Sequence, residues 1–383
     1  MLRTPPTPQT EYWKPHEEFS SADVRFPVTI KREETRHYVN YNYYETVDEQ
    51  LGHGSFGATY KVVQVDVRNP GATDFTKPTH ILKHYFTSTP EMAEQALLHA
   101  KREFYTSKML TRLRLRHPDY PLGSPFFCEE IAVCAEDLVF DLTPTREYPN
   151  GFIYTLFPFK NAFNLHQFMY EVLYPSFEPQ PMNFKRQVVN ISWNLCETVR
   201  LLNAAEIYHN DIKAENIIVS GEYPGGGTAP IVTMLRFIDF GETCIGATTL
   251  DYLRRRDDPD DMNPSLQCNV PNRETRYSYR GSRAYRDPAA DDIYEIVDVD
   301  KLWPLFEMYS CAVVMQHLID PQFKFRRPIS FLPTSGSPPG FSELITQMTA
   351  PLKRNSRGFL VTSVRPSWDL VVSKLARIQQ SLA

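Results

Sequence analysis

Strand-forming and helix-forming segments are kept apart along this chain, and that separation limits the folds it can adopt. From Tyr43 to Tyr85, β-branched and aromatic residues alternate with polar ones, which is typical of an antiparallel sheet. Beyond Glu307 the sequence is mostly helical, with an interruption at PTSGSPPG. Because 42% of the 383 residues are apolar, the chain can bury a large core. We therefore expect an α+β fold with a small β-rich part followed by a larger helical part.

Three segments between these regions carry clear signals for single elements. Thr89 is a helix N-cap residue and Pro90 fits the first helical position, so a long helix is expected from there to about Leu113. The apolar run GFIYTLFPF predicts a short buried strand. Residues 184–206 have helical periodicity and form a second predicted helix.

The N-terminal stretch differs from the rest of the chain. It is rich in proline, threonine and charge and has no sustained period, so we expect it to be flexible or laid along the domain. The predicted organisation is an extension at 1–40, a β-rich part at 41–157 and a helical part at 158–383.

The segment IYHNDIKAENII places Asp211, Lys213 and Asn216 in one short loop. An aspartate can accept the proton of an attacking hydroxyl, a lysine can neutralise a moving phosphoryl group, and an asparagine can hold a magnesium ion. The loop therefore predicts phosphoryl transfer. By itself it fits enzymes that act on proteins and enzymes that act on small molecules.

Further motifs stand before and after this loop. The segment LGHGSFGATYKV has Gly52, Gly54 and Gly57 between two predicted strands, where backbone amides can approach phosphate oxygens. A dinucleotide fold would need a helix directly after them. Lys83 lies on the next strand, and Asp239 begins an Asp-Phe-Gly triplet directly after an apolar strand.

In this order the motifs resemble those of the eukaryotic-type serine/threonine protein kinases, over about residues 43–375. The resemblance implies a two-lobed kinase-like fold that uses ATP with magnesium, or alternatively manganese. The implied roles are Asp211 as the catalytic base, Lys213 at the γ-phosphate, Asn216 and Asp239 on the metal, Lys83 on the ATP phosphates, and the three loop glycines over them.

The same resemblance implies further site residues. Lys83 needs a carboxylate partner from the following helix; Glu103 is our choice, and Glu94 is the rival. The other implied positions are Leu156 as the gatekeeper behind adenine, Asn164 at the ribose, and Ser282 as a hydroxyl that positions the substrate by bridging to the catalytic aspartate and lysine.

The chain departs from the family pattern at three places. The usual His-Arg-Asp reads His209-Asn210-Asp211, which removes the arginine that pairs with a phosphorylated activation segment. The resemblance places this segment between Asp239 and Asp287, and we expect activity without its phosphorylation. Glu307 replaces the aspartate that braces the catalytic loop. Ala289 replaces a glutamate whose partner would be Arg365, so that ion pair is expected to be absent or supplied by Asp291 or Asp292.

Two other functions compete with an active serine/threonine kinase of protein substrates. One is a pseudokinase that acts as a scaffold or nucleotide-binding module, and the other is a small-molecule kinase of the aminoglycoside or choline kinase type. Every residue expected to touch nucleotide or metal is present, which favours the active protein kinase, and Lys213 favours the serine/threonine branch.

Composition limits the partners and the location. The net charge of -5 is spread along the chain, which argues against a nucleic-acid surface, and no apolar run is long enough to predict a membrane span. Without a signal peptide, we expect action inside a cell, in the cytoplasm or nucleus or as an effector within a host cell, with room for a regulatory partner. The six cysteines are far apart, which predicts reduced, buried thiols rather than a zinc site.

Overall fold

A computed structural model describes most of the chain. The described residues are 25–27, 42–46, 51–53, 56–66, 69–74, 76–116, 131–144, 149–160, 162–175, 181–222, 231–254, 268, 281–290, 302–323, 337–354, 360–361 and 365–382. Gly54, Asp291, Asp292 and most of the 1–40 extension lie outside these residues.

The N-terminal part of the described chain is an antiparallel sheet. Its seven strands are β1 Arg25–Pro27, β2 Asn42–Thr46, β3 Gly52–His53, β4 Gly57–Asp66, β5 His80–Tyr85, β6 Asp137–Asp141 and β7 Phe152–Pro158. They run in the order β1-β2-β4-β5-β7-β6, with β3 added beside β4. The short β1 belongs to the predicted extension and pairs with β2, so at least this piece of residues 1–40 lies along the sheet.

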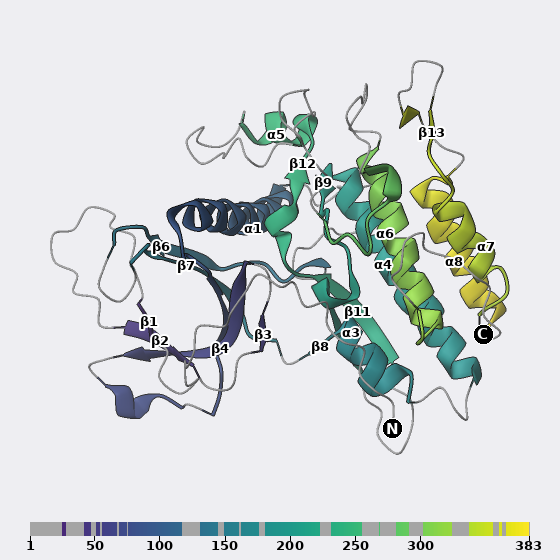
Figure 1. Cartoon of the computed structure of the whole chain (residues 1–383). Coiled ribbons are helices and arrows are strands. Elements are labelled where there is room, and N and C mark those ends of the chain that lie inside the picture. Colours follow the sequence, from purple (N-terminus) through teal and green to yellow (C-terminus); the bar gives the residue numbers. More distant parts are fainter. Residues whose placement is uncertain are drawn as a thin grey trace.

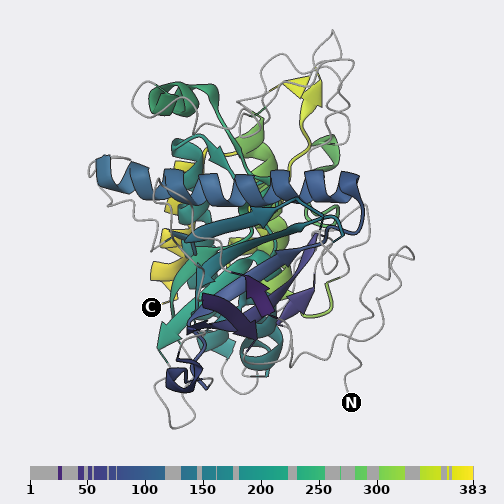
Figure 2. The same ribbon diagram turned by 90° about the vertical axis from the view of Figure 1, so that its left-hand side faces the viewer.

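One long helix covers a face of this sheet. Helix α1 (Pro90–Arg116) packs on β5, β6 and β7, and Figures 1 and 2 show it lying across the strands. Thr89 caps it as predicted, because its Oγ1 accepts a hydrogen bond from the Met92 amide at 3.2 Å. Apolar residues of α1 such as Ala100 and Phe104 meet Ile153 and Phe157 in a buried cluster.

The remaining described residues are mainly helical. The helices are α3 Leu165–Phe168, α4 Pro181–Ala204, α5 Ala247–Arg254, α6 Trp303–Ile319, α7 Phe341–Met348 and α8 Trp368–Ser381, with single turns η2 Pro70–Ala72, η3 Met169–Leu173, η4 Ala214–Asn216 and η5 Phe240–Glu242. The short strands are β8 Phe163–Asn164, β9 Ile207–Tyr208, β10 Ile217–Glu222, β11 Ile231–Phe237, β12 Cys244–Ile245, β13 Lys353–Arg354 and β14 Leu360–Val361. Helices α4, α6, α7 and α8 lie side by side, away from the sheet (Figure 1).

The expected α+β composition is confirmed, with strands first and helices later. Helix α6 is buried along nearly its whole length, and its apolar residues form the largest core together with those of α4. Within the described residues, no helix combines the length and the apolar character needed to cross a bilayer.

The prediction that the cysteines are reduced thiols is wrong for Cys244, which forms a disulfide with Cys268. Their Cα atoms are 4.8 Å apart, within the range that a disulfide can bridge. Cys134 is also disulfide-bonded, whereas Cys196 and Cys311 are free and buried. The pairing could not be predicted from the sequence, because Cys244 and Cys268 are 24 positions apart and only the tertiary fold brings them together.

Candidate functional site

Two strand pairs bring the predicted site residues together. In the hairpin of β10 and β11, Ile217 pairs with Phe237, so Asn216 and Asp239 lie at the same end of the hairpin. The Ile238 amide donates to the Asn216 carbonyl at 3.0 Å and fixes this end. On the other side of the loop, β9 pairs with β12. The predicted catalytic loop, residues 209–216, is thus held between two pairs of strands.

Asp211 lies at the centre of a network of polar contacts. Its Oδ2 accepts hydrogen bonds from Lys213 Nζ at 2.6 Å and from Asn216 Nδ2 at 2.9 Å. Its Oδ1 accepts from the Ser282 amide at 2.7 Å, and Lys213 Nζ also reaches Ser282 Oγ at 3.0 Å. The residues predicted as base, phosphate contact, metal ligand and substrate-positioning hydroxyl therefore meet at one carboxylate.

A second group of charges forms around Lys83. Its Nζ lies 3.1 Å from Glu103 Oε2 and 2.7 Å from Asp239 Oδ1, so one ammonium joins α1 to the Asp-Phe-Gly triplet. Glu103 is buried, and Tyr85 also donates to its Oε2 at 2.5 Å. The rival Glu94 is exposed. The open choice between the two glutamates is thereby decided in favour of Glu103.

These contacts shift the pKa values of the charged groups. Burial alone would lower the pKa of Lys83, but the carboxylates of Asp239 and Glu103 outweigh it and hold that pKa well above its ordinary value. Enclosure raises the pKa of Glu103, with Lys83 opposing. Partial burial would raise the pKa of Asp239, but the Lys83 ammonium outweighs it and the net effect lowers that pKa. Asp239 is therefore a carboxylate at neutral pH, as a metal ligand must be.

The backbone is strained at two site residues. Asn210 has φ 64° and Asp239 has φ 63°, which lie in the left-handed region of backbone conformation that residues other than glycine seldom adopt. Asn tolerates this region better than most residues, which gives position 210 a local reason to be Asn. The Asn210 side chain also donates to the Glu242 carbonyl at 3.0 Å, just beyond the Asp-Phe-Gly triplet.

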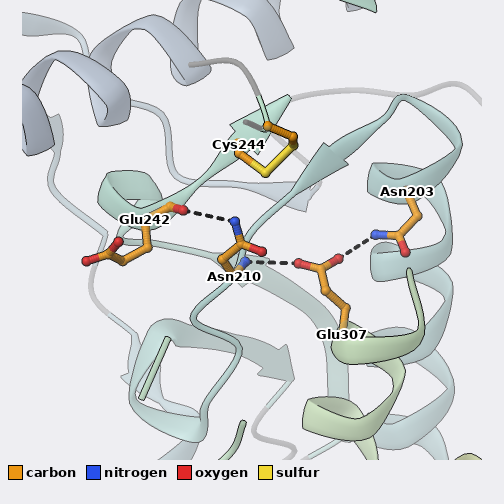
Figure 3. The surroundings of a disulfide bond; sticks show 6 residues. Asn203, Asn210, Glu242, Cys244 and Glu307 are labelled. Carbon is orange, nitrogen blue, oxygen red and sulfur yellow. Dashed lines mark hydrogen bonds between the residues drawn. A yellow bond between two sulfur atoms is a disulfide. The ribbon is translucent and has the colours of Figure 1, made fainter. Parts of the chain in front are cut away.

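Glu307 braces the loop despite its extra methylene. Its Oε1 accepts from the Asn210 amide at 3.0 Å, and its Oε2 accepts from the Asn203 side chain, as Figure 3 shows. Trp368 of α8 in turn donates to Asn203 Oδ1 at 3.0 Å. Burial raises the pKa of Glu307 to about 7, against the hydrogen bonds from Asn210 and Asn203. A chain of polar contacts thus runs from Trp368 of α8 through Asn203 and Glu307 to the predicted catalytic loop.

Arg365 forms an ion pair with a carboxylate that the sequence did not point to. Its described partner is Asp287, at 2.7 Å, and both side chains are nearly excluded from solvent. The expectation that the ion pair is absent is therefore wrong, while Asp291 and Asp292 lie outside the described residues. Arg365 also donates to the carbonyls of Ala350 and Leu305, each at 2.7 Å, so the guanidinium joins three segments.

Leu156, the predicted gatekeeper, lies on the opposite face of the sheet from Lys83. Leu156 pairs with Leu82, and both belong to the apolar cluster on the face away from Lys83. Thr155 pairs directly with Lys83 and shares its face. Because side chains alternate along a strand, Leu156 and Thr155 point to opposite faces of the sheet.

Asn164 has a local structural task. Its Oδ1 accepts from the Gln167 amide at 2.8 Å, and Gln167 reaches back to the Asn164 amide, which makes a capping box at the start of α3. This accounts for an asparagine here without a ligand.

The described glycines of the predicted phosphate loop differ in what they require. A Cβ on Gly57 would lie 2.2 Å from the His84 carbonyl oxygen, so only glycine permits β4 to approach β5 there, whereas Gly52 has open space around it. Between them, Phe56 stacks on His99 of α1 with ring centroids 3.9 Å apart. His99 also lies 3.4 Å from Glu242, which connects the loop tip to the Asp-Phe-Gly segment.

Sequence reasoning missed several residues of this site. Tyr85 could have been found, because it lies two positions after Lys83 and so on the same strand face. Asn203 and Asp287 carry no local signal, since their partners Glu307 and Arg365 are far away in the sequence.

The residues present fit a magnesium nucleotide. Hard oxygen ligands suit magnesium, which proteins usually hold with one or two carboxylates while substrate phosphates and waters complete its shell. Asp239 offers an ionised carboxylate whose side chain is 40% exposed. Asn216 uses Nδ2 to donate to the carbonyl and the carboxylate of Asp211, which leaves its Oδ1 as the ligand atom. No cluster of His, Cys, Asp and Glu within the described residues forms a separate all-protein metal site.

Comparisons with known proteins add no relatives. No protein-family model matches this chain, and no curated protein matches it at a significant level.

Proposed function

We propose that this protein is a two-lobed serine/threonine protein kinase that uses ATP and magnesium, or manganese, and acts inside a cell. The proposal is supported by two groups of polar contacts, one around Asp211 and one around Lys83. Asp211 lies within hydrogen-bond distance of Lys213, Asn216 and Ser282, and Lys83 bridges Glu103 and Asp239. Such pre-positioned groups are what phosphoryl transfer requires of a protein.

Each group has a task in this reaction. Asp211 Oδ2 accepts the proton of the substrate hydroxyl, and Lys213 neutralises charge on the moving phosphoryl group from its place beside that carboxylate. Lys83 orients the nucleotide phosphates, and Glu103 fixes the position of its ammonium. When bound, magnesium supplies charge neutralisation at the β- and γ-phosphates, with Asn216 and Asp239 as its holders.

We further propose that activity does not require phosphorylation of the activation segment. Asn210 makes a direct hydrogen bond to the Glu242 carbonyl, and Glu307 holds the Asn210 amide. These contacts connect the catalytic loop to the start of the segment without a phosphate group. Phosphatase treatment should therefore leave activity unchanged; loss of activity that returns on phosphorylation of Thr275, Tyr277 or Ser278 contradicts this part of the proposal.

The test is transfer from labelled ATP with magnesium to generic protein substrates. Asp211→Asn should lower the rate by about a hundredfold to ten-thousandfold, the usual contribution of a positioned base. Glu103→Gln should also lose activity, whereas Glu94→Gln is the matched control, since Glu94 lies exposed on the same helix. Lys83→Met and Asp239→Asn complete the set.

Binding of ATP is read separately as thermal stabilisation by the nucleotide with magnesium. Stabilisation without transfer to any acceptor would identify a scaffold and refute the proposal. Transfer to small hydroxyl compounds but never to protein would refute the choice of substrate. An active Asp211→Asn protein would refute the assignment of the base.

A further inference from the structure

The disulfide lies beside the catalytic loop. Cys244 opens β12 two residues after Glu242, and β12 pairs Cys244 with Tyr208, the residue before His209. Figure 3 shows Cys244 near Asn210, whose side chain reaches Glu242 and whose amide reaches Glu307. Anything that loosens β12 therefore acts on the strand that leads directly into the loop.

Cys268 anchors the other end of the bond. It is 8% exposed, and its amide donates to the Ile245 carbonyl at 2.9 Å. It belongs to an apolar cluster with Tyr208, Ala290 and Phe306. The same cluster thus joins the end of segment 281–290, which contains Ser282, to strand β9.

The disulfide supplies a covalent contact to the activation segment, for which the loop has no charge pair. With Asn210 in place of an arginine, the loop has no cation there to pair with a phosphate on the activation segment. The S–S bond fixes a residue of that segment against β12 in the structure in which the charged groups are assembled. Disulfides of proteins that act in reducing compartments are usually transient and redox-sensing.

We propose that Cys244 and Cys268 form a thiol–disulfide switch in which the oxidised pair holds the active arrangement and reduction lowers activity. The proposal rests on the proposed kinase function. Its partners by chemical class are dithiol reductants and disulfide oxidants. Cys244 is the more exposed of the two residues, so we place the attack of the reductant at its sulfur.

The exchange reaction is balanced. A thiolate of the dithiol attacks Cys244 Sγ, the S–S bond breaks, and the Cys268 thiolate leaves and takes a proton. The second thiolate of the reductant then displaces Cys244 from the mixed disulfide. Two electrons pass from the dithiol to the cysteine pair, and the reductant becomes a disulfide. Oxidation by a disulfide runs the same steps in reverse.

The test compares the whole protein in oxidised and in reduced dithiothreitol, with the state of both cysteines determined by alkylation and mass spectrometry. Reduction should lower transfer to protein substrate roughly ten- to hundredfold, since a displacement of about 1 Å in a positioned group costs up to about a hundredfold. Thermal stabilisation by ATP with magnesium should persist. Reoxidation should restore the rate.

The Cys244→Ser/Cys268→Ser variant is the matched control, because it removes this pair and leaves every other cysteine in place. It should show the reduced rate under both conditions. A double variant as active as the oxidised protein, or equal rates of the native protein in both verified states, would overturn the switch.

Amide hydrogen exchange separates this inference from the kinase proposal. Reduction should speed exchange at residues 207–211 and at Cys268 relative to the oxidised protein. If no state transfers phosphate but this exchange changes, the kinase proposal fails and the coupling of the disulfide to the loop stands. Unchanged exchange on verified reduction overturns the inference, whatever the activity.

Discussion

The ion pair of Asp287 and Arg365 gives the sharpest test of the fold, because its stability cost can be worked out from its contacts. The two side chains are 3% and 1% exposed. Removing one partner of a buried pair costs about 3–5 kcal/mol, because the other charge stays buried. Arg365 keeps two carbonyl acceptors, which places the cost of Asp287→Ala near the lower end, about 3 kcal/mol.

Asp287 also accepts a hydrogen bond from the Ala289 amide at 2.9 Å, and losing it adds about 1 kcal/mol. We therefore expect Asp287→Ala to lower the free energy of unfolding by roughly 4 kcal/mol in total. Asp287→Asn keeps an acceptor for that amide and should lose only about 3 kcal/mol. The difference between the two variants isolates the hydrogen bond from the charge.

The assay is urea denaturation followed by tryptophan fluorescence, with the midpoint and slope fitted for each variant. The double variant Asp287→Ala/Ala289→Glu returns a carboxylate to the position the kinase pattern predicts, and it should recover part of the loss. A cycle with Arg365→Met should give a double variant whose loss is smaller than the two single losses combined. A loss below about 1 kcal/mol for Asp287→Ala, or strictly additive losses, would refute the buried pair.

Two further predictions concern the support of the site. Burial raises the pKa of Glu307 from 4.5 to about 7, so the folded protein favours the protonated carboxyl. The resulting contribution to the free energy of unfolding is fully present below pH 4.5 and is lost as the pH rises through 7. Denaturation at pH 5 and pH 8 should show this decline, of order 3 kcal/mol, in the native protein and not in Glu307→Gln; equal pH dependence contradicts it. The second prediction concerns the stack of Phe56 on His99 at the predicted phosphate loop. His99→Ala should raise the KM for ATP several-fold, whereas His99→Phe preserves the stacking with Phe56 and should retain most of the affinity. An unchanged KM for ATP in His99→Ala would show that the stack of Phe56 on His99 does not contribute to ATP binding.

Much of the fold follows from local signals. The Thr89 cap and the proline after it predict the start of α1, and helical periodicity predicts α4, because these patterns depend on residues close together in the sequence. The juxtaposition of Lys83 with Glu103 was also within reach, since one strand and the helix after it supply both residues.

The features that the sequence does not reveal have a common physical origin. The face on which Leu156 lies follows from strand register, which is fixed by pairing with β5 and β6 and which a single strand does not reveal. The partner of Arg365 and the disulfide of Cys244 depend on which distant segments pack together. Local propensity is encoded in neighbouring residues, whereas these contacts are decided by tertiary packing.

The departures from the kinase pattern share one property. Glu307 reaches the Asn210 amide with a longer side chain, Asp287 supplies the acid missing at Ala289, and Asn210 contacts the Glu242 carbonyl in place of a charge pair. The energy of such contacts depends on the distance between the atoms and on their exclusion from solvent, not on which sequence position supplies them. A chain can therefore keep the contacts of a site while the residue types that define its sequence motif change. In this chain the charged groups converge on Asp211 and Lys83, although no protein-family model matches the sequence.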